Sequence, residues 1–193
     1  MREPLLHLLF MILIVSVTGC VNIATTGAQA IYNNHSIKKS IKDQYITMQA
    51  YQKLYARYKQ FEDANISVAT FNREILIAGQ VPTRSKRSKI EKLIKNVPDV
   101  KAIYNGMYIA APASNIVRLS DAWITAKVKA KLIASADLDA TQIKVVTENG
   151  TVYLMGILLP EEAEEAVDLA RETDGVQKVV RLFSYIKISK TLA

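Results

Sequence analysis

The sequence predicts an α+β protein made of two tandem αββαβ units, each a three-stranded mixed sheet with two helices on one face. Two observations carry this prediction. Three segments recur in the same order about 77 residues apart, which indicates a duplicated unit. Each copy also places two strand-like segments between two helix-like segments. With 193 residues, 50% of them hydrophobic, the chain suits one or two small globular domains and is too apolar for disorder.

The repeat covers the first helix, the hairpin and the last strand of each unit. DQYITMQAYQKLY, from Asp43, aligns with DAWITAKVKAKLI, from Asp121. ISVATFNREILIAGQV, from Ile66, aligns without a gap on IKVVTENGTVYLMGIL, from Ile143. Finally, VPDVKAIYN resembles TDGVQKVVR, which opens at Thr173. Each unit is small and buries a modest core, so packing between the copies would stabilise both.

The first helix and the hairpin have clear signals in the second copy. We expect Ser120 to be the N-cap of a helix that continues to Ala134, since no glycine or proline interrupts it. Asn149-Gly150 favours a type I′ turn between the two strands, and the first copy lacks this dipeptide. At the end of each hairpin, Gly79 and Gly156 indicate a bulge or a turn more than a ligand site.

A second helix and a third strand complete each unit. The helices are expected over 84–96 and 160–173, with Pro160 well suited to the first helical turn. The last strands are expected over 101–109 and 177–188. Alternation of apolar residues places one face of each sheet against its helices.

The amino end predicts export and lipidation. MREPLLHLLFMILIVSVTGC has one arginine followed by an apolar run too short to span a membrane comfortably, which is typical of a signal peptide over 1–19. Val17-Thr18-Gly19-Cys20 resembles the bacterial lipobox, so Cys20 is the expected site of acylation. Residue 21 is Val and not Asp, and in this it resembles the Gram-negative lipoproteins that are sorted to the outer membrane. We expect a lipidated tether over 20–37, a first domain over 38–110, a linker over 111–119 and a second domain over 120–190.

Composition narrows the function. The net charge of +7 favours an anionic partner, but nucleic acid is not expected for an exported lipoprotein. The sequence offers few candidate catalytic side chains. His35 is the only histidine expected after processing, Cys20 is expected to be acylated, and the sequence has no phosphate-loop motif and no cluster of metal ligands. The acidic run EEAEEAVD, over 161–168, is better explained as a solvated surface than as an acid site. We therefore expect no enzyme activity, no cofactor and no metal.

The first helix of the second copy has two apolar faces. At about 100° per residue, Ile124, Val128 and Leu132 form the face expected to pack on the sheet. Trp123 and Ile133 fall nearly opposite, among alanines, with lysines on both sides of them. A tryptophan with small neighbours and flanking lysines is typical of a surface at a membrane interface. The alternative is that this face packs against the other domain.

Charge and aromatic residues also differ between the copies. RSKRSKIEKLIK, over 84–95, is strongly basic, whereas the corresponding helix of the second copy is acidic. Opposite charges could steer the domains together or attract a charged partner, or each could simply face solvent. Tyr45, Tyr51, Tyr55 and Tyr58 are expected to pack in the core and at the rim of the first copy.

These units resemble the BON domain (bacterial osmotically inducible protein and nodulation domain). The resemblance rests on the αββαβ order, on Gly79 or Gly156 ending the hairpin, and on Val100 or Val176 opening the last strand. A lipobox followed by two such units is similar to the outer-membrane dual BON-domain lipoproteins of Gram-negative bacteria. That resemblance implies a lipid-anchored protein on the periplasmic face of the outer membrane that supports envelope integrity, including at the division site.

The resemblance also implies a ligand. In the similar lipoproteins the first helix of the second domain binds anionic phospholipid of the phosphatidylglycerol type. Matched to this sequence, the phospholipid-binding residues are Trp123, Ile124, Ala126, Lys127, Ala130, Lys131 and Ile133. The alternative is a protein-binding adaptor that docks on an envelope machine, such as one for outer-membrane barrel assembly or for the regulation of cell-wall hydrolases.

Overall fold

The computed structural model describes the backbone of residues 27–186 and the side chains of residues 39–186. Both copies of the repeat lie in one compact unit, which begins at Lys38. The expected signal peptide and Cys20 lie outside the described residues, and so does the side chain of His35. Residues 27–37, which we expected in the tether, belong to a helix that continues into the first domain.

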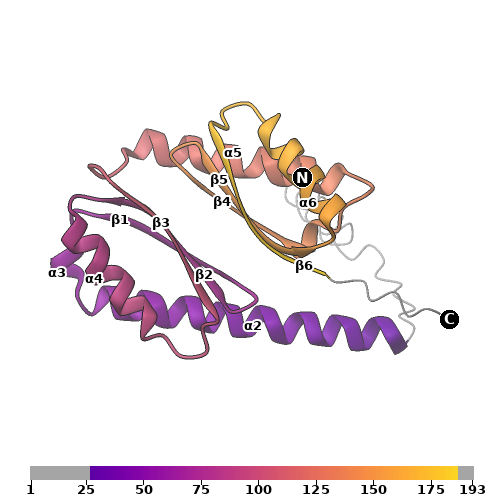
Figure 1. The fold of residues 1–193 in the computed structure, drawn as a ribbon, viewed down its shortest axis with the longest axis horizontal. Helices are drawn as coiled ribbons and strands as arrows, with labels where there is room; N and C mark the ends of the chain where they lie inside the picture. The colour runs from indigo at the N-terminus through magenta and orange to yellow at the C-terminus, as the bar shows by residue number, and fades with distance from the viewer. Residues whose placement is uncertain (1–26, 187–193) are drawn as a thin grey trace, which may run out of the picture. The chain divides into compact units, whose positions relative to one another are not determined.

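The first domain contains two main helices and one mixed sheet (Figure 1). The order is α2 (Gly27–Tyr55), α3 (Tyr58–Phe61), β1 (Asn65–Phe71), β2 (Glu74–Val81), α4 (Arg84–Lys95) and β3 (Ala102–Ile109). Strand β2 lies in the centre, antiparallel to β1 and parallel to β3. The core joins α2 and α4 to one face of this sheet, with Ile46, Ile77 and Ile90 at 1% exposure or less.

The second domain repeats this arrangement. The order is α5 (Asn115–Ala134), η1 (Ala140–Gln142), β4 (Ile143–Glu148), β5 (Thr151–Leu158), α6 (Pro160–Arg171) and β6 (Lys178–Tyr185). Strand β5 is antiparallel to β4 and parallel to β6. Val128, Leu154 and Val167 are fully buried between the helices and the sheet. Two mixed sheets, each with two helices on one face, confirm the predicted fold.

The start of α5 was predicted wrongly. Ser120 lies inside the helix, and the N-cap is Ser114, whose Oγ accepts a hydrogen bond from the amide of Val117 at 3.3 Å. Nothing between Asn115 and Ala134 breaks a helix, so the earlier cap takes precedence. The second half of the predicted linker over 111–119 is therefore helical.

An aspartate at the same position of each first helix holds the hairpin of its domain. The Asp43 carboxylate accepts hydrogen bonds from the amides of Asn72 and Arg73, at 2.7 and 2.8 Å. Asp121 accepts the equivalent bonds from Asn149 and Gly150, at 2.7 and 2.9 Å. All four turn residues have positive φ, so the first copy makes the same turn without a glycine. A buried carboxylate paired with two amides stabilises a turn that its sequence alone does not favour.

The two domains pack through the faces of the sheets that their helices leave uncovered. Side chains alternate along the central strands, so Ile75 and Ile77 face the helices while Leu76 and Ala78 form a second cluster with Tyr153 and Met155. This explains why EILIAGQV and TVYLMGIL are apolar on both faces.

Close contacts fix this interface. The Tyr153 hydroxyl donates to the carbonyl of Gly106 at 3.2 Å, and a Cβ at Gly106 would lie 2.8 Å from that hydroxyl. Lys144 Nζ donates to the carbonyl of Thr70 at 3.1 Å. Each sheet therefore has its own helices on one face and the other sheet on its opposite face.

Candidate functional site

Helix α5 buries one face and exposes the other. Ile124, Val128 and Leu132 are 4%, 0% and 1% exposed and belong to the core of the second domain. On the opposite side, Trp123 is 66% exposed and Ile133 is 72% exposed. Because the domains meet through their sheets, this side of α5 is not used for packing between them. The alternative that Trp123 and Ile133 join the two domains is therefore wrong.

One residue of the expected lipid-binding set does not belong to this surface. Ile124 follows Trp123 directly in the sequence, but each helical residue turns the side chain by about 100°. That rotation places Ile124 against the sheet, where it is 4% exposed. Ala126 and Ala130 are exposed, as are Trp123 and Ile133.

The exposed surface of α5 is longer than the sequence indicated. Six residues on α5 are exposed and follow a spacing of three and four residues. We call them the α5 strip: Ile116, Leu119, Trp123, Ala126, Ala130 and Ile133. Ile116 is 81% exposed and Leu119 is 73% exposed. At 1.5 Å per residue, the strip runs for about 26 Å along the helix. Sequence reasoning missed its first two members because it began the helix at Ser120, although the same spacing continues backward to Ile116.

Two lysines beside the α5 strip connect α5 to the end of α6. Lys127 Nζ donates to the carbonyl of Asp174 at 2.5 Å, and Lys131 Nζ donates to the carbonyl of Glu172 at 2.7 Å. Cations at the carboxyl end of a helix satisfy its last carbonyls and interact favourably with its dipole. Each ammonium group keeps further N–H donors. On the other side, Lys129 is exposed and makes no hydrogen bond or ion pair with the described residues.

Helix α2 carries a corresponding strip. Its outward residues, which we call the α2 strip, are Ile41, Tyr45, Met48, Gln52 and Tyr55. Tyr45 occupies the place of Trp123 in the repeat, and Tyr55 occupies the place of Ile133. Tyr45 and Tyr55 are 56% and 68% exposed.

The expectation that the tyrosines pack in the core or at its rim holds for Tyr55, whose ring centroid lies 6.2 Å from that of Tyr51, and for Tyr51 itself. The Tyr51 hydroxyl accepts a hydrogen bond from the amide of Val68 at 3.0 Å. Tyr45 and Tyr58 are exposed, because their positions fall on the outward side of the helices that carry them.

Comparison with known proteins gives the family. The sequence model of the BON-domain family matches residues 42–111 and 120–187. The chain belongs to the BON-domain family. Both matches follow the two αββαβ units, so the protein has two BON domains.

Relatives share this region at moderate identity. The chain is 36% identical over 126 residues to the 21 kDa hemolysin of Actinobacillus pleuropneumoniae, which is 65% of each chain. It is 32% identical over 124 residues to the outer membrane lipoprotein DolP of Haemophilus influenzae, 64% of each chain. The osmotically-inducible protein Y of Escherichia coli is 25% identical over 125 residues, which is 63% of this chain and 62% of that protein. These matches span slightly less than two thirds of each relative's length.

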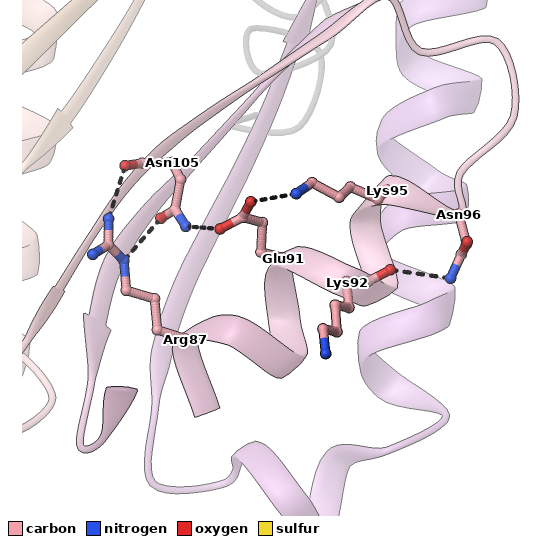
Figure 2. A network of polar contacts seen from close by, with 6 residues as sticks. All are labelled: Arg87, Glu91, Lys92, Lys95, Asn96 and Asn105. Carbon is pink, nitrogen blue, oxygen red and sulfur yellow. Dashed lines mark hydrogen bonds and ion pairs between the residues drawn. The ribbon is translucent and has the colours of Figure 1, made fainter. Parts of the chain in front are cut away.

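The basic helix of the first BON domain is partly neutralised within that domain. Figure 2 shows Glu91 between Asn105 and Lys95, with the Asn105 amide at 2.7 Å and Lys95 Nζ at 2.7 Å. The hydrogen bond from Lys95 lowers the pKa of Glu91 most, and the one from Asn105 lowers it further. The Arg87 guanidinium turns toward the side chain and the carbonyl of Asn105, at 3.3 Å each (Figure 2). Helix α4 thus uses part of its charge to fasten itself to β3.

The acidic helix of the second BON domain is engaged in the same way. Glu162 accepts from the amide of Leu159 at the start of α6, Glu164 pairs with Arg181, and Asp168 pairs with Arg171. The contact between the domains is made by the two sheets. The opposite charges of α4 and α6 therefore do not hold the domains together in the packed structure. These three carboxylates act as local ties within the second domain.

Within residues 27–186, no three His, Cys, Asp or Glu side chains converge as metal ligands. No helix in the same range is long and apolar enough to cross a bilayer.

Proposed function

We propose that this protein is a non-enzymatic, lipid-anchored component of the Gram-negative outer membrane that binds anionic phospholipid through the α5 strip and so supports envelope integrity. The observation that carries the proposal is the 66% exposure of Trp123 at the centre of an apolar strip that neither domain covers. Acylation of Cys20 would hold the chain at the membrane, and the strip would select the lipid beneath it. The relative named as an outer membrane lipoprotein supports the location.

The geometry of the strip suits an interface between water and lipid. A helix that lies in the plane of a membrane inserts its apolar face about 5–10 Å into the headgroup and acyl boundary. The α5 strip provides two large aliphatic residues at its amino end, the indole in its middle and Ile133 at its carboxyl end. An indole is favoured at headgroup depth because its ring is apolar and its N–H can reach a polar partner. The intervening alanines let the helix backbone approach the headgroups closely.

The charges beside the strip select anionic lipid. A lysine or arginine near an anionic surface contributes about 1 kcal/mol, and salt reduces this contribution. Lys129 and Arg118 are exposed on α5, and Lys127 and Lys131 keep N–H donors beyond those bound to carbonyls. We therefore expect binding to be stronger on phosphatidylglycerol than on zwitterionic lipid. A role at the division site is part of this proposal because anionic lipid would concentrate the protein there.

A matched pair of variants tests the proposal. The chain from Gly27, the first residue of α2, lacks the acylated cysteine, so vesicle binding reports only the folded part. Trp123→Glu should abolish cosedimentation with phosphatidylglycerol vesicles. Tyr45→Glu places the same charge on the α2 strip and should leave the cosedimentation unchanged. Neither variant should change the circular dichroism spectrum. Binding that survives Trp123→Glu, or that Tyr45→Glu removes equally, would contradict the proposal.

One observation favours an adaptor as a second candidate. Spacing of three and four residues along the α5 strip is the pattern with which one helix packs against another. A photoreactive amino acid at position 123 separates the two functions in intact cells. An adaptor would give a discrete protein adduct, whereas a phospholipid-binding helix would give a lipid adduct.

A further inference from the structure

A polar hollow lies on the first BON domain, away from the α5 strip. Its volume is about 460 Å³, and it is formed by one side of α2, by the two residues that follow α2 and by the turn between α4 and β3. The lining includes Tyr45, Gln49, Gln52, Lys53, Arg57 and Pro98. Five of these six residues offer a hydrogen-bonding group, two offer a positive charge, and no acidic residue lines the hollow.

The cations and amides of this hollow have no partner among the described residues. Lys53 and Arg57 make no side-chain hydrogen bond and no ion pair there, in contrast to Lys86, Arg87 and Lys95 on the neighbouring helix. The side-chain amides of Gln49 and Gln52 are also unpaired in the same range. Cations and amides that converge on one open hollow provide the donors that an anionic, hydroxyl-rich ligand requires.

The second BON domain closes the corresponding place. Lys127 stands where the first domain has Gln49, and its Nζ donates to the carbonyl of Asp174, the residue that corresponds to Pro98. Lys131 corresponds to Lys53, but its ammonium group is bound to the carbonyl of Glu172. In the second domain these two lysines therefore fill the place of the hollow. In the first domain α2 is joined to the turn by another pair, Lys42 and Asp99 at 3.3 Å, and Lys53 stays unpaired among the described residues. The open hollow is therefore not a requirement of the fold.

We propose that this hollow binds an anionic sugar, one that carries a phosphate or a carboxylate. Lys53 and Arg57 bind the anionic group, the amides of Gln49 and Gln52 bind sugar hydroxyls, and the half-exposed ring of Tyr45 stacks on the C–H face of the sugar. An inorganic anion could accept hydrogen bonds from the cations and the amides but has no C–H face for the ring, so Tyr45 favours the sugar. This site is separate from the α5 strip and does not depend on phospholipid binding.

The test is an NMR titration of the full chain in neutral-detergent micelles. Glucose 1-phosphate and glucuronate are the two anionic probes, with glucose and inorganic phosphate as references. We expect one or both anionic sugars to shift the backbone amides from Gln49 to Arg57, and to bind at least about tenfold more tightly than glucose. The probe that binds more tightly identifies the anionic group as phosphate or carboxylate. Inorganic phosphate that binds as tightly as the better of the two anionic sugars would overturn the assignment of a sugar.

Two double variants with the same change of charge make the test specific. Lys53→Gln/Arg57→Gln should weaken binding of the anionic sugar about tenfold or more. Arg118→Gln/Lys129→Gln removes two positive charges from α5 and should leave that affinity unchanged. Equal weakening by both variants, or none by the first, would overturn the proposal. Tyr45→Ala supplies a second readout on an exposed residue and should weaken binding of the sugars but not of inorganic phosphate.

Discussion

The first helices of the two BON domains agree on their inner side and differ on their outer side. Inward, Asp43 and Asp121 make the same pair of bonds to their hairpins. The hydroxyl groups of Thr47 and Thr70 lie 2.7 Å apart, as do those of Thr125 and Thr147. Outward, Trp123 and Ile133 correspond to Tyr45 and Tyr55. The fold determines the inner contacts, while the outer sides are free to acquire different ligands.

The largest expected effect tests the shared inner side. Asp43→Ala and Asp121→Ala each remove a buried carboxylate and leave two turn amides without their acceptor. We expect each variant to lose about 3 kcal/mol of the free energy of unfolding, measured by urea denaturation. Equal losses would show that the two turns depend on the same contact. A loss below about 1 kcal/mol in either variant would show that the turn holds without its aspartate.

The next effect concerns the contact between the two sheets. In Gly106→Ala the new methyl group would lie within 3.0 Å of three atoms of the Tyr153 ring and hydroxyl, and Tyr153 is only 7% exposed. We expect a destabilisation of about 2 kcal/mol in thermal unfolding. Tyr153→Ala in the same chain removes the clash, so the double variant should lose less than the sum of the two single variants. Additive losses would argue against this contact.

A smaller effect, dependent on pH, is expected at Glu148. Burial at the interface raises the pKa of Glu148 above its ordinary value of 4.5, and the negative charge of Asp121 adds to the effect. Its favourable contribution to stability is therefore complete below pH 4.5 and is lost as the pH rises through the raised pKa. Glu148→Gln should raise the free energy of unfolding at pH 7 by about 1 kcal/mol and should have little effect at pH 4. A variant that is equally stabilised at both pH values would contradict this account.

The smallest effect concerns the outer sides. Trp123→Glu and Tyr45→Glu alter residues that are more than half exposed, so each should change the free energy of unfolding by less than about 0.5 kcal/mol. Urea denaturation of both variants measures this and shows whether a loss of vesicle binding reflects the surface alone. A large loss of stability at Trp123 would indicate that the indole packs against the protein.

Periodicity and the internal repeat were sufficient to predict the fold. The alternation of apolar residues defined the strands, and the Asn149-Gly150 dipeptide located one hairpin. The equivalent turn at Asn72-Arg73 could not be found from local residues, because a distant carboxylate holds it. Long-range contacts of this kind leave no local pattern.

The candidate site was predicted in its centre but not in its extent. The exposure of Trp123 follows from helical geometry. Ile116 and Leu119 were not predicted as part of the strip, because the helix was predicted to begin only at Ser120. The bonds of Lys127 and Lys131 to carbonyls depend on where α6 ends, which no pattern within α5 reveals. The polar hollow was missed because a single sequence does not show which cations remain unpaired.

The contact between the two sheets gives this single chain the architecture of a dimer, with one BON domain in the place of each subunit. Each BON domain supplies the cover that the other domain's sheet needs, and only residues 110–114 separate β3 from α5. Partners joined by so short a connection meet at a high effective concentration, so dilution does not separate them as it would two free subunits. The chain therefore builds its two-sheet architecture without an encounter between separate molecules.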